Sequence, residues 1–180
     1  MDSTAERDAF SATDPYGFCR ADGTRLEEPR PSGGVRCPPC GRSWYRYSAP
    51  AVGTEIVQDK KALVTVGARE PEKGRLELPG GFLEVGEHPE DGTVREVREE
   101  LGVEIELVGN PILPEIHTYG PDEAYVLPIG FRARIAEGEP NPTDDAAKIS
   151  WFSAEEVEDA DFAWEHDRRM VRAASKTRSR

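Results

Sequence analysis

The chain has 180 residues, of which 37% are hydrophobic and 32% charged, and its formal net charge is −12 at pH 7. This length fits one ordinary domain with a small attachment, and the acidic balance argues against nucleic-acid or anionic membrane partners. No apolar run approaches the roughly 20 residues of a membrane-spanning helix, and the first residues do not have the pattern of a secretory signal. We therefore expect a globular, cytoplasmic protein.

Four parts follow one another along the chain. Residues 1–14 lack hydrophobic periodicity and are expected to form a disordered leader. Residues 15–48 form a short, loop-rich segment that carries all three cysteines, and residues 49–173 have the alternating strand and helix patterns of an α+β domain. The basic residues 174–180 are expected to be a frayed tail.

The cysteine-bearing segment has the spacing of a zinc ribbon. Cys37-Pro38-Pro39-Cys40-Gly41 is one half of such a site, with two thiolates three residues apart. In the other half, Cys19-Arg20-Ala21-Asp22-Gly23, an aspartate replaces the fourth thiol. Three cysteines cannot all pair with one another, which favours metal ligation in a reducing compartment. Two interpretations stay open: a ribbon that persists without metal, or one structural Zn²⁺ bound by Cys19, Asp22, Cys37 and Cys40.

The larger domain begins with two predicted strands. Ile56-Val57 and Ala62–Val66 are joined by the polar turn at residues 58–60, which is the pattern of a hairpin. A loop rich in proline, glycine and charge follows at residues 69–74, and a short apolar piece then ends at Leu78-Pro79-Gly80-Gly81.

A helix is predicted from Pro89 to Leu101. Proline suits its first turn, two acidic residues follow at the positive end of the helix dipole, and Gly102 suits the left-handed position after the last turn. His88 is a poorer N-cap than serine or aspartate would be. Gly92 costs roughly 1 kcal/mol relative to alanine inside a helix, so we attribute it to close packing.

Further strands are predicted after the helix, at residues 103–108, 112–119 and 124–135, and Trp151-Phe152 ends the last one. Ser153 and Glu156 have the spacing of a capping box and predict that a final helical region begins there.

One face of the predicted helix carries carboxylates. An apolar stripe is formed by Val94, Val97 and Leu101. On nearly the opposite side lie Glu96, Glu99 and Glu100. Like charges at this spacing repel, so the cluster is either a solvated acidic surface or a set of oxygen ligands for a hard cation such as Mg²⁺ or Mn²⁺.

The surrounding residues resemble a known family. Gly81 is followed after five residues by Glu87, then after seven residues by Arg95-Glu96, an apolar residue, Glu99-Glu100, Gly102 and apolar Val103. This pattern resembles the Nudix signature at every defined position over 23 residues. Residues 78–82, and the stretch from 144–146 to 151–152, are also similar to parts of a Nudix domain. The resemblance implies a Nudix α/β/α sandwich with a mixed sheet, here preceded by the small zinc-ribbon-like module.

The resemblance also implies roles for individual residues. The metal-binding carboxylates of the family are matched by Glu96, Glu99 and Glu100. Glu96 is also a candidate to orient or deprotonate the attacking water. Glu87 either helps to hold metal or pairs with Arg95, which we expect to position carboxylates. Gly81 is expected in a turn with unusual dihedral angles and Gly102 at a helix end. The implied activity is that of a pyrophosphohydrolase dependent on Mg²⁺ or Mn²⁺.

The substrate is less well defined by the sequence. A ribbon before a Nudix domain is similar to the layout of NADH pyrophosphatases, but Pro114–Tyr119 stands where that subfamily carries Ser-Gln-Pro-Trp-Pro-Phe-Pro. ADP-ribose or a dinucleotide-like compound is our leading hypothesis; diadenosine polyphosphates, nucleotide sugars and damaged nucleoside triphosphates are alternatives. Tyr119, which lies where diadenosine polyphosphate hydrolases tend to carry a tyrosine, and Phe82 are candidate walls for a base, and each also suits a core position.

Several residues keep alternative interpretations. A loop base or a further metal ligand is sought among Glu115, Glu139, Asp144 and Asp145, which also suit solvated loops. His117 suits either the surface or a substrate contact, and Trp164, His166 and Asp167 are assigned to packing or surface. For the whole chain, the alternatives to a hydrolase are a Nudix-fold sensor that binds a nucleotide without cleaving it and an interaction module with a merely solvated acidic helix. The resemblance also allows a homodimer.

Overall fold

A computed structural model describes residues 17–26, 34–45, 47–120, 124–143 and 146–174. The expected leader at residues 1–14 and all but the first residue of the basic tail lie outside these ranges. The chain divides into two compact units, Met1–Tyr47 and Ser48–Arg180.

The N-terminal unit is built around one small hairpin. Strands β1 (Gly34–Arg36) and β2 (Ser43–Tyr45) pair antiparallel, and a separate bridge joins Phe18 to Arg25. Its core consists of four buried residues with a partly buried Trp44 packed against them, namely Cys19, Leu26, Val35 and Cys37. Two cysteines therefore take the place that larger apolar side chains fill in an ordinary core.

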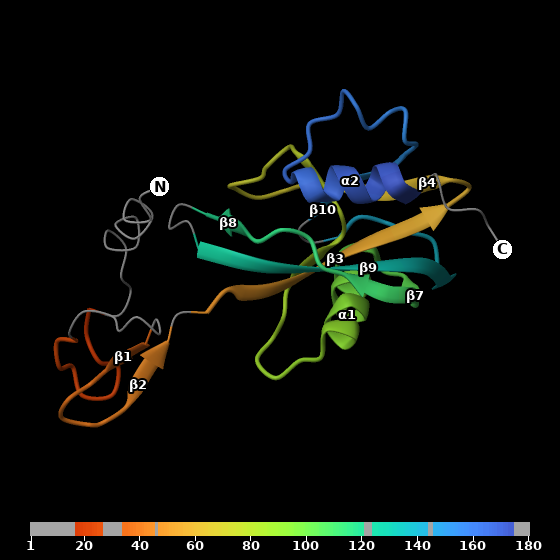
Figure 1. The fold of residues 1–180 in the computed structure, drawn as a ribbon. Coiled ribbons are helices and arrows are strands. Elements are labelled where there is room, and N and C mark those ends of the chain that lie inside the picture. Colours follow the sequence, from red (N-terminus) through yellow and green to blue (C-terminus); the bar gives the residue numbers. More distant parts are fainter. Residues whose placement is uncertain (1–16, 27–33, 46, 121–123, 144–145, 175–180) are drawn as a thin grey trace. The chain divides into compact units, whose positions relative to one another are not determined.

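The second unit contains a mixed, curled sheet (Figure 1). Its path runs β10-β4-β3-β9-β7, with β5 paired to β4, β6 to β3 and β8 to β9. The strands are β3 (Ala49–Gln58), β4 (Lys61–Gly67), β5 (Leu76–Glu77), β6 (Gly80–Phe82), β7 (Glu104–Ile112), β8 (His117–Tyr119), β9 (Ala124–Glu137) and β10 (Ala146–Phe152). The β3–β9 pair is parallel and the other pairs are antiparallel.

The predicted hairpin and first helix are confirmed. Asp59 and Lys60 both have positive φ, 49° and 64°, as a tight turn between β3 and β4 requires. Helix α1 (Pro89–Leu101) ends at Gly102, whose φ of 68° is left-handed. A Cβ added at Gly92 would lie 2.3 Å from Leu83 Cδ2, so close packing explains the glycine.

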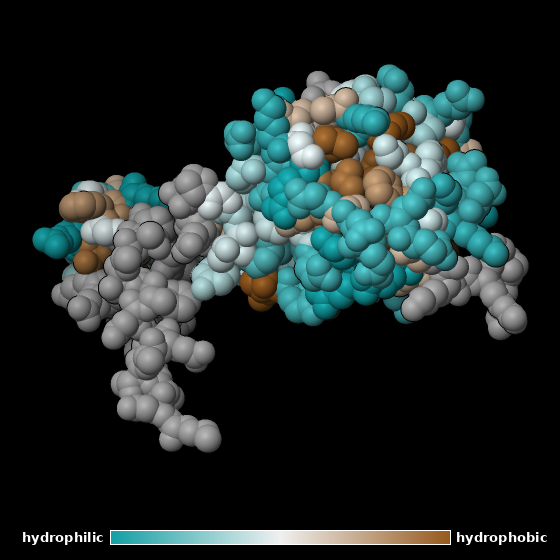
Figure 2. Space-filling model, turned by 90° about the horizontal axis from the view of Figure 1, so that it is seen from above, coloured by the Kyte–Doolittle hydropathy of each residue, from teal (hydrophilic) through white to brown (hydrophobic). Residues whose placement is uncertain are grey.

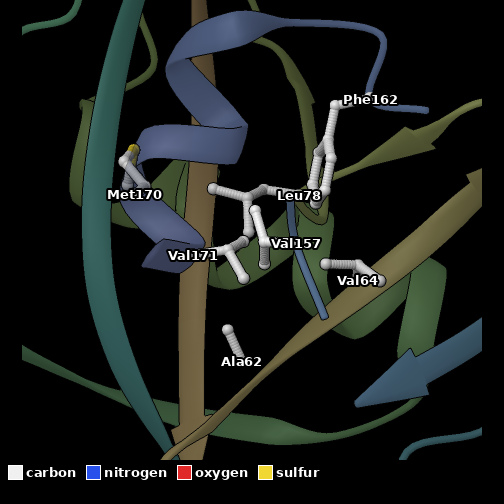
Figure 3. Packing of buried hydrophobic residues seen from close by; sticks show 7 residues of the cluster. All are labelled: Ala62, Val64, Leu78, Val157, Phe162, Met170 and Val171. Atoms are coloured by element: carbon white, nitrogen blue, oxygen red, sulfur yellow. The ribbon is translucent and has the colours of Figure 1, made fainter. Parts of the chain in front are cut away.

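Each face of the sheet is covered by one helix (Figure 1). Under α1 lies a cluster that includes Ile56, Leu63, Val97 and Leu101. On the other face, α2 (Glu165–Ala174) covers the cluster drawn in Figure 3, whose members are Ala62, Val64, Leu78, Val157, Phe162, Met170 and Val171. Two apolar cores on the two faces give the predicted α/β/α sandwich.

Two predicted elements were wrong in extent. The strand expected at 112–119 is divided, because β7 continues to Ile112 and β8 begins only at His117. Pro114 lies in the gap and has no N–H for a sheet hydrogen bond. The final helix begins at Glu165, although Glu156 does accept a hydrogen bond from Ser153 N at 2.8 Å. Residues 154–159 form turns, consistent with repulsion among the four acidic residues in this stretch.

The face of the second unit that Figure 2 shows is mainly hydrophilic, with hydrophobic residues in patches between hydrophilic ones. Within the described ranges, every helix is too short or too polar to cross a membrane.

Candidate active site and candidate metal centre

Arg95 lies between the carboxylates of α1 and the loop before it. Its guanidinium donates to both Glu87 oxygens, with Nε–Oε1 and Nη2–Oε2 distances of 2.7 and 2.8 Å. Its Nη1 donates to Glu96 Oε1 at 2.9 Å and to Glu99 Oε2 at 3.0 Å. Arg95 also binds the backbone oxygen of Phe82 at 3.2 Å. It therefore positions three of the four predicted metal-binding carboxylates, as expected from the sequence.

The local charges shift the pKa of two of these carboxyl groups in opposite directions. Hydrogen bonds from Arg95, together with one from the backbone of Glu84, lower the pKa of Glu87 to about 2. The pKa of Glu96 is raised because burial outweighs the stabilising hydrogen bond from Arg95. Glu96 therefore holds a proton more readily than Glu87 does, although both are bound to the same guanidinium.

The two glycines of β6 support the other carboxylates. Gly80 N donates to Glu100 Oε2 at 3.2 Å. A Cβ on Gly81 would lie 2.7 Å from the carboxylate atoms of Glu96, so any larger residue would displace that carboxylate. The expectation that Gly81 needs unusual dihedral angles was wrong: Gly81 is a strand residue without positive φ, and it is required for the close approach of Glu96.

A cleft of about 460 Å³ opens beside this group. Glu96 and Glu100 line it together with Gly80 and Gly81. Glu87 and Glu99 are not part of the lining, and the side chain of Glu99 is 56% exposed. Three of the four predicted metal-binding carboxylates thus surround Arg95, and the two that line the cleft are Glu96 and Glu100.

Aromatic and imidazole rings line the same cleft. Phe82 and Tyr119, the two predicted base-stacking residues, are in edge contact with ring centroids 5.6 Å apart. The ring centroids of Tyr119 and Trp164 are 6.0 Å apart. The ring centroid of His117 lies 4.3 Å from that of Trp164 and 5.0 Å from that of His166. Burial lowers the pKa of His117, and burial with the neighbouring charges lowers that of His166 to about 4.

Three of the cleft residues were missed by the sequence reasoning, which had assigned Trp164, His166 and Asp167 to packing or surface. All three line the cleft, and Trp164 stands just before α2. Asp167 offered a usable signal: at helical spacing it lies on the same stripe as Met170 and Val171, where a carboxylate is unusual.

Of the downstream acids considered as a base or extra ligand, Glu115 and Glu139 lie outside the cleft lining. Glu115 is paired with Arg169, with a distance of 2.9 Å between Oε1 and Nη1. Glu139 is exposed, and neither residue lines the cleft. Asp144 and Asp145 lie outside the described residues. The cleft instead contains Glu70, Glu72 and Glu77 from the loop after β4 and from β5.

In the N-terminal unit, two matching turns bring the four predicted zinc ligands together. Cys19 N donates to Thr24 O at 2.7 Å and Gly23 N to Cys19 O at 2.8 Å. Cys37 and Gly41 repeat this arrangement, and the two glycines have φ of 73° and 72°. Each turn therefore depends on a glycine that can take the left-handed conformation.

The ligand atoms of these turns converge. One atom from each of Cys19, Asp22, Cys37 and Cys40 lies within 4.8 Å of all the others. The Cys19–Cys40 Sγ distance is 3.6 Å, near the roughly 3.8 Å edge that a tetrahedron with Zn–S bonds of about 2.3 Å requires. Burial raises the pKa of the Cys37 thiol to about 12, and the backbone N–H of Thr24 lowers that of Asp22. Three sulfurs and one carboxylate fit zinc by chemistry and by spacing.

Comparison with known proteins identifies the family that this fold and site define. Residues 48–174 match the model of the NUDIX domain, so the chain belongs to the Nudix family. The prediction of a Nudix domain is thereby confirmed. A similar fold is found in the crystal structure of a Nudix hydrolase from Nitrosomonas europaea, with a TM-score of 0.71 and 24% identity over 89% of this chain and 91% of that one.

Two relatives are similar in sequence. The NAD-capped RNA hydrolase NudC of Pseudomonas aeruginosa (strain LESB58) is 33% identical over 142 residues, which are 76% of this chain and 47% of that protein. An ADP-ribose pyrophosphatase of Methanocaldococcus jannaschii is 30% identical over 132 residues, which are 69% of this chain and 72% of that protein. The chain thus spans about half the length of the NudC relative and most of the ADP-ribose pyrophosphatase.

Proposed function

We propose that the chain hydrolyses the diphosphate of a nucleoside diphosphate that is linked to another group, with ADP-ribose or a dinucleotide-like compound as the substrate. The observation that carries this proposal is a single cleft that contains two carboxylates of the Nudix signature, Glu96 and Glu100, together with a wall of rings. A diphosphate between cations at the carboxylates and a base stacked on the rings would use both features.

Glu96, Glu99 and Glu100 are the proposed ligands of Mg²⁺ or Mn²⁺, and Glu87 is a further candidate. These groups offer only oxygen donors, which hard cations prefer, and Arg95 neutralises only part of their combined charge. Bound divalent cations supply neutralisation of the phosphate oxygens and a lower pKa for an attacking water. Glu96 faces the cleft and is the group that we expect to orient that water or accept its proton.

The proposed base-binding residues are Phe82 and Tyr119, extended by Trp164 and His117. Phe82 is 45% exposed, so part of its ring is free for a ligand. The lowered pKa of His117 keeps this imidazole neutral near pH 7, and a neutral ring stacks on a base without adding charge.

The relatives support a dinucleotide-like substrate by their names, since one is an ADP-ribose pyrophosphatase and the other a NAD-capped RNA hydrolase. For this chain we propose a small-molecule nucleotide and not an RNA, because a net charge of −12 opposes binding to a phosphate backbone. A homodimer stays a prediction that follows from the family alone.

We also propose one structural Zn²⁺ in the N-terminal unit. Four protein ligands fill a tetrahedral site, so this ion would stabilise the fold and take no part in the reaction. The three cysteines are free thiols, consistent with the cytoplasmic location that the sequence predicts.

Release of phosphate-containing products from a substrate panel tests the proposed activity. The panel comprises ADP-ribose, NADH, diadenosine polyphosphates, nucleotide sugars and nucleoside triphosphates, each with Mg²⁺ or Mn²⁺. We expect turnover of ADP-ribose or a dinucleotide, with a loss of at least about 100-fold in Glu99→Gln and Glu100→Gln, the upper end of what supporting residues of metal sites cost. Glu90→Gln, an exposed residue of the same helix, is the matched control. A folded protein without metal-dependent turnover of any compound would instead indicate a nucleotide sensor.

A further inference from the structure

Asp167 is a buried carboxylate at the cleft that the proposed reaction does not use. Its residue is only 5% exposed, although it lines the cleft. It comes from the buried stripe of α2, one turn before Met170 and Val171, which belong to the core in Figure 3. Burial, with a smaller contribution from nearby Glu77, raises its pKa to about 7. A carboxyl group in this setting is costly for the fold when ionised.

The contacts of Asp167 join α2 to the first of residues 78–81, which we call the cleft floor. Leu78 N donates to Asp167 Oδ2 at 2.9 Å, and His166 Nε2 lies 3.3 Å from Oδ1. The side chain of Leu78 lies in the cluster beneath α2, beside Val171 and Val157 (Figure 3). Leu78 is therefore held by its side chain and by its backbone at once.

The residues that follow Leu78 support the candidate metal ligands. Pro79 O accepts from Thr54 N at 2.8 Å, which fixes this segment to β3. Gly80 N then donates to Glu100, and Gly81 provides the space that Glu96 occupies. Residues 78–81, the cleft floor, thus connect Asp167 at one end to two carboxylates of α1 at the other.

We propose that Asp167 is a positioning residue whose carboxylate holds the cleft floor and thereby sets the orientation of Glu96 and Glu100 toward a divalent cation. An asparagine oxygen would accept the same hydrogen bond from Leu78 at a lower cost to stability, so a role for the negative charge explains the carboxylate better than packing does. A charged acceptor binds an N–H more strongly than a neutral one. This inference rests on the proposed metal site.

The two imidazoles near Asp167 both have a lowered pKa. His166 on the same helix has its pKa lowered to about 4, and the pKa of His117 on β8, which lies against His166, is also lowered. Glu77 on β5 contributes a negative charge that favours the protonated form of Asp167. We therefore expect the ionisation of Asp167 to tighten the cleft floor as the pH rises from 6 to 8.

Binding of Mn²⁺ to the full chain, measured by electron paramagnetic resonance without substrate, tests this role separately from turnover. In the wild type we expect the dissociation constant to rise as the pH falls from 8 to 6. Asp167→Asn resembles the protonated residue, so it should bind Mn²⁺ more weakly than the wild type at pH 8, by a margin that shrinks toward pH 6. Asp167→Ala, which also lacks the acceptor for Leu78, should bind about 10-fold or more weakly at both pH values.

Controls separate positioning from a packing role and from failure of the proposed activity. Glu165→Gln changes an exposed acid of the same helix and should leave Mn²⁺ binding unaltered. Any contribution of Glu96 to the pH dependence is shared by the wild type and Asp167→Asn, so their difference isolates Asp167. If Asp167→Asn binds Mn²⁺ with the affinity and pH dependence of the wild type, the proposal is wrong. An inactive protein that still shows the expected difference would retain this inference while refuting hydrolysis.

The thermal stability of metal-free protein gives a second readout. The pKa of Asp167 is higher in the folded state than in the unfolded state, because burial favours the protonated carboxyl group. Protonation of Asp167 therefore stabilises the fold, and this stability is lost as the pH rises through about 7. Asp167→Asn should therefore melt at a higher temperature than the wild type at pH 8, by a margin that shrinks toward pH 6. If the two proteins melt at the same temperature at both pH values, no ionised carboxylate is buried at position 167, and the proposal is wrong.

Discussion

In the N-terminal unit the four candidate ligands already converge, whereas on α1 an arginine lies between the carboxylates. The ligand atoms of the cysteine cluster are all within 4.8 Å of one another, and no other such group of three occurs in the ranges that the structure describes. On α1, Arg95 takes the bonds to Glu87, Glu96 and Glu99 that cations could also use. The first arrangement is closed and complete, and the second is open to a cleft.

We propose that the two clusters use metal in different ways. A closed tetrahedral set leaves no position for a reactant, and its contribution is to folding. A cluster held together by an internal cation stays folded without metal, and it leaves carboxylate oxygens facing the cleft for exchangeable ions.

Loss of one thiolate should abolish the closed site. Cys37 is completely buried, and Cys37→Ser should remove bound zinc and unfold the N-terminal unit, because structural zinc sites contribute on the order of 10 kcal/mol. Zinc content by atomic emission and limited proteolysis of the segment measure both effects. Asp22→Cys completes a four-thiolate set and should keep one zinc. A wild-type protein that contains no zinc and resists proteolysis would show that the ribbon persists by packing alone.

Removal of the internal cation should destabilise the open cluster. Arg95→Met leaves three carboxylates without their partner and should lower the metal-free stability by about 2–4 kcal/mol, somewhat less than for a fully buried pair because the Arg95 side chain is 23% exposed. Chemical denaturation with and without Mg²⁺ measures this loss, and Mg²⁺ should restore part of it.

Arg98→Met is the matched control on the same helix. The pair between Arg98 and Glu104 is largely exposed, so its loss should lower the stability far less than the loss of Arg95 does. Equal losses in the two variants would mean that Arg95 has no special part in holding the cluster together.

A methyl group at the cleft floor should affect activity more than folding. Gly81→Ala places a Cβ 2.7 Å from the Glu96 carboxylate and must displace it. We expect kcat/KM to fall about 10- to 100-fold, the range seen when the support of a metal ligand is disturbed. The melting temperature should change little, because a carboxylate is at the end of a flexible side chain. Unchanged kinetics would show that the position of Glu96 is not important.

The smallest effect concerns acid stability. The folded pKa of Glu87 is lowered to about 2 from an ordinary value near 4.5, so its ionised form contributes stability above pH 4.5 that is lost as the pH falls toward 2. Glu87→Gln should therefore have a lower melting temperature than the wild type at pH 5 and 7, and this difference should disappear near pH 2. A difference that is the same at every pH would exclude the Arg95 pair as its cause.

The parts of the fold that local signals specify could be predicted from the sequence. Helix α1 begins at Pro89 and ends before Gly102 as expected, because caps and periodicity are properties of neighbouring residues. Pro114 and the acidic residues of 154–159 argue locally against a continuous strand and an early helix, but the starts of β8 at His117 and of α2 at Glu165 could not be obtained this way, since pairing with β9 and packing on the sheet decide them.

The site shows the same division. The resemblance predicted the signature carboxylates and a positioning role for Arg95, whereas the simultaneous bonds of Arg95 to Glu87, Glu96 and Glu99 are visible only in the folded structure. Trp164 and Asp167 join the cleft from about 60 to 90 residues further along the chain than the signature. Only the tertiary fold brings them to the cleft beside Phe82 and Leu78. In the sequence, this placement was indicated only by Asp167, a carboxylate on an apolar stripe of the helix.

The parallel pairing of β3 with β9 also has a consequence for the order of folding. Ala49 is registered with Val126, and the cleft floor needs contacts from β3, α1 and α2 together. Such contacts between distant parts of the sequence form slowly and late. During synthesis, the signature helix leaves the ribosome well before Asp167 does, so the nascent chain cannot assemble the cleft until nearly all of this domain has been translated.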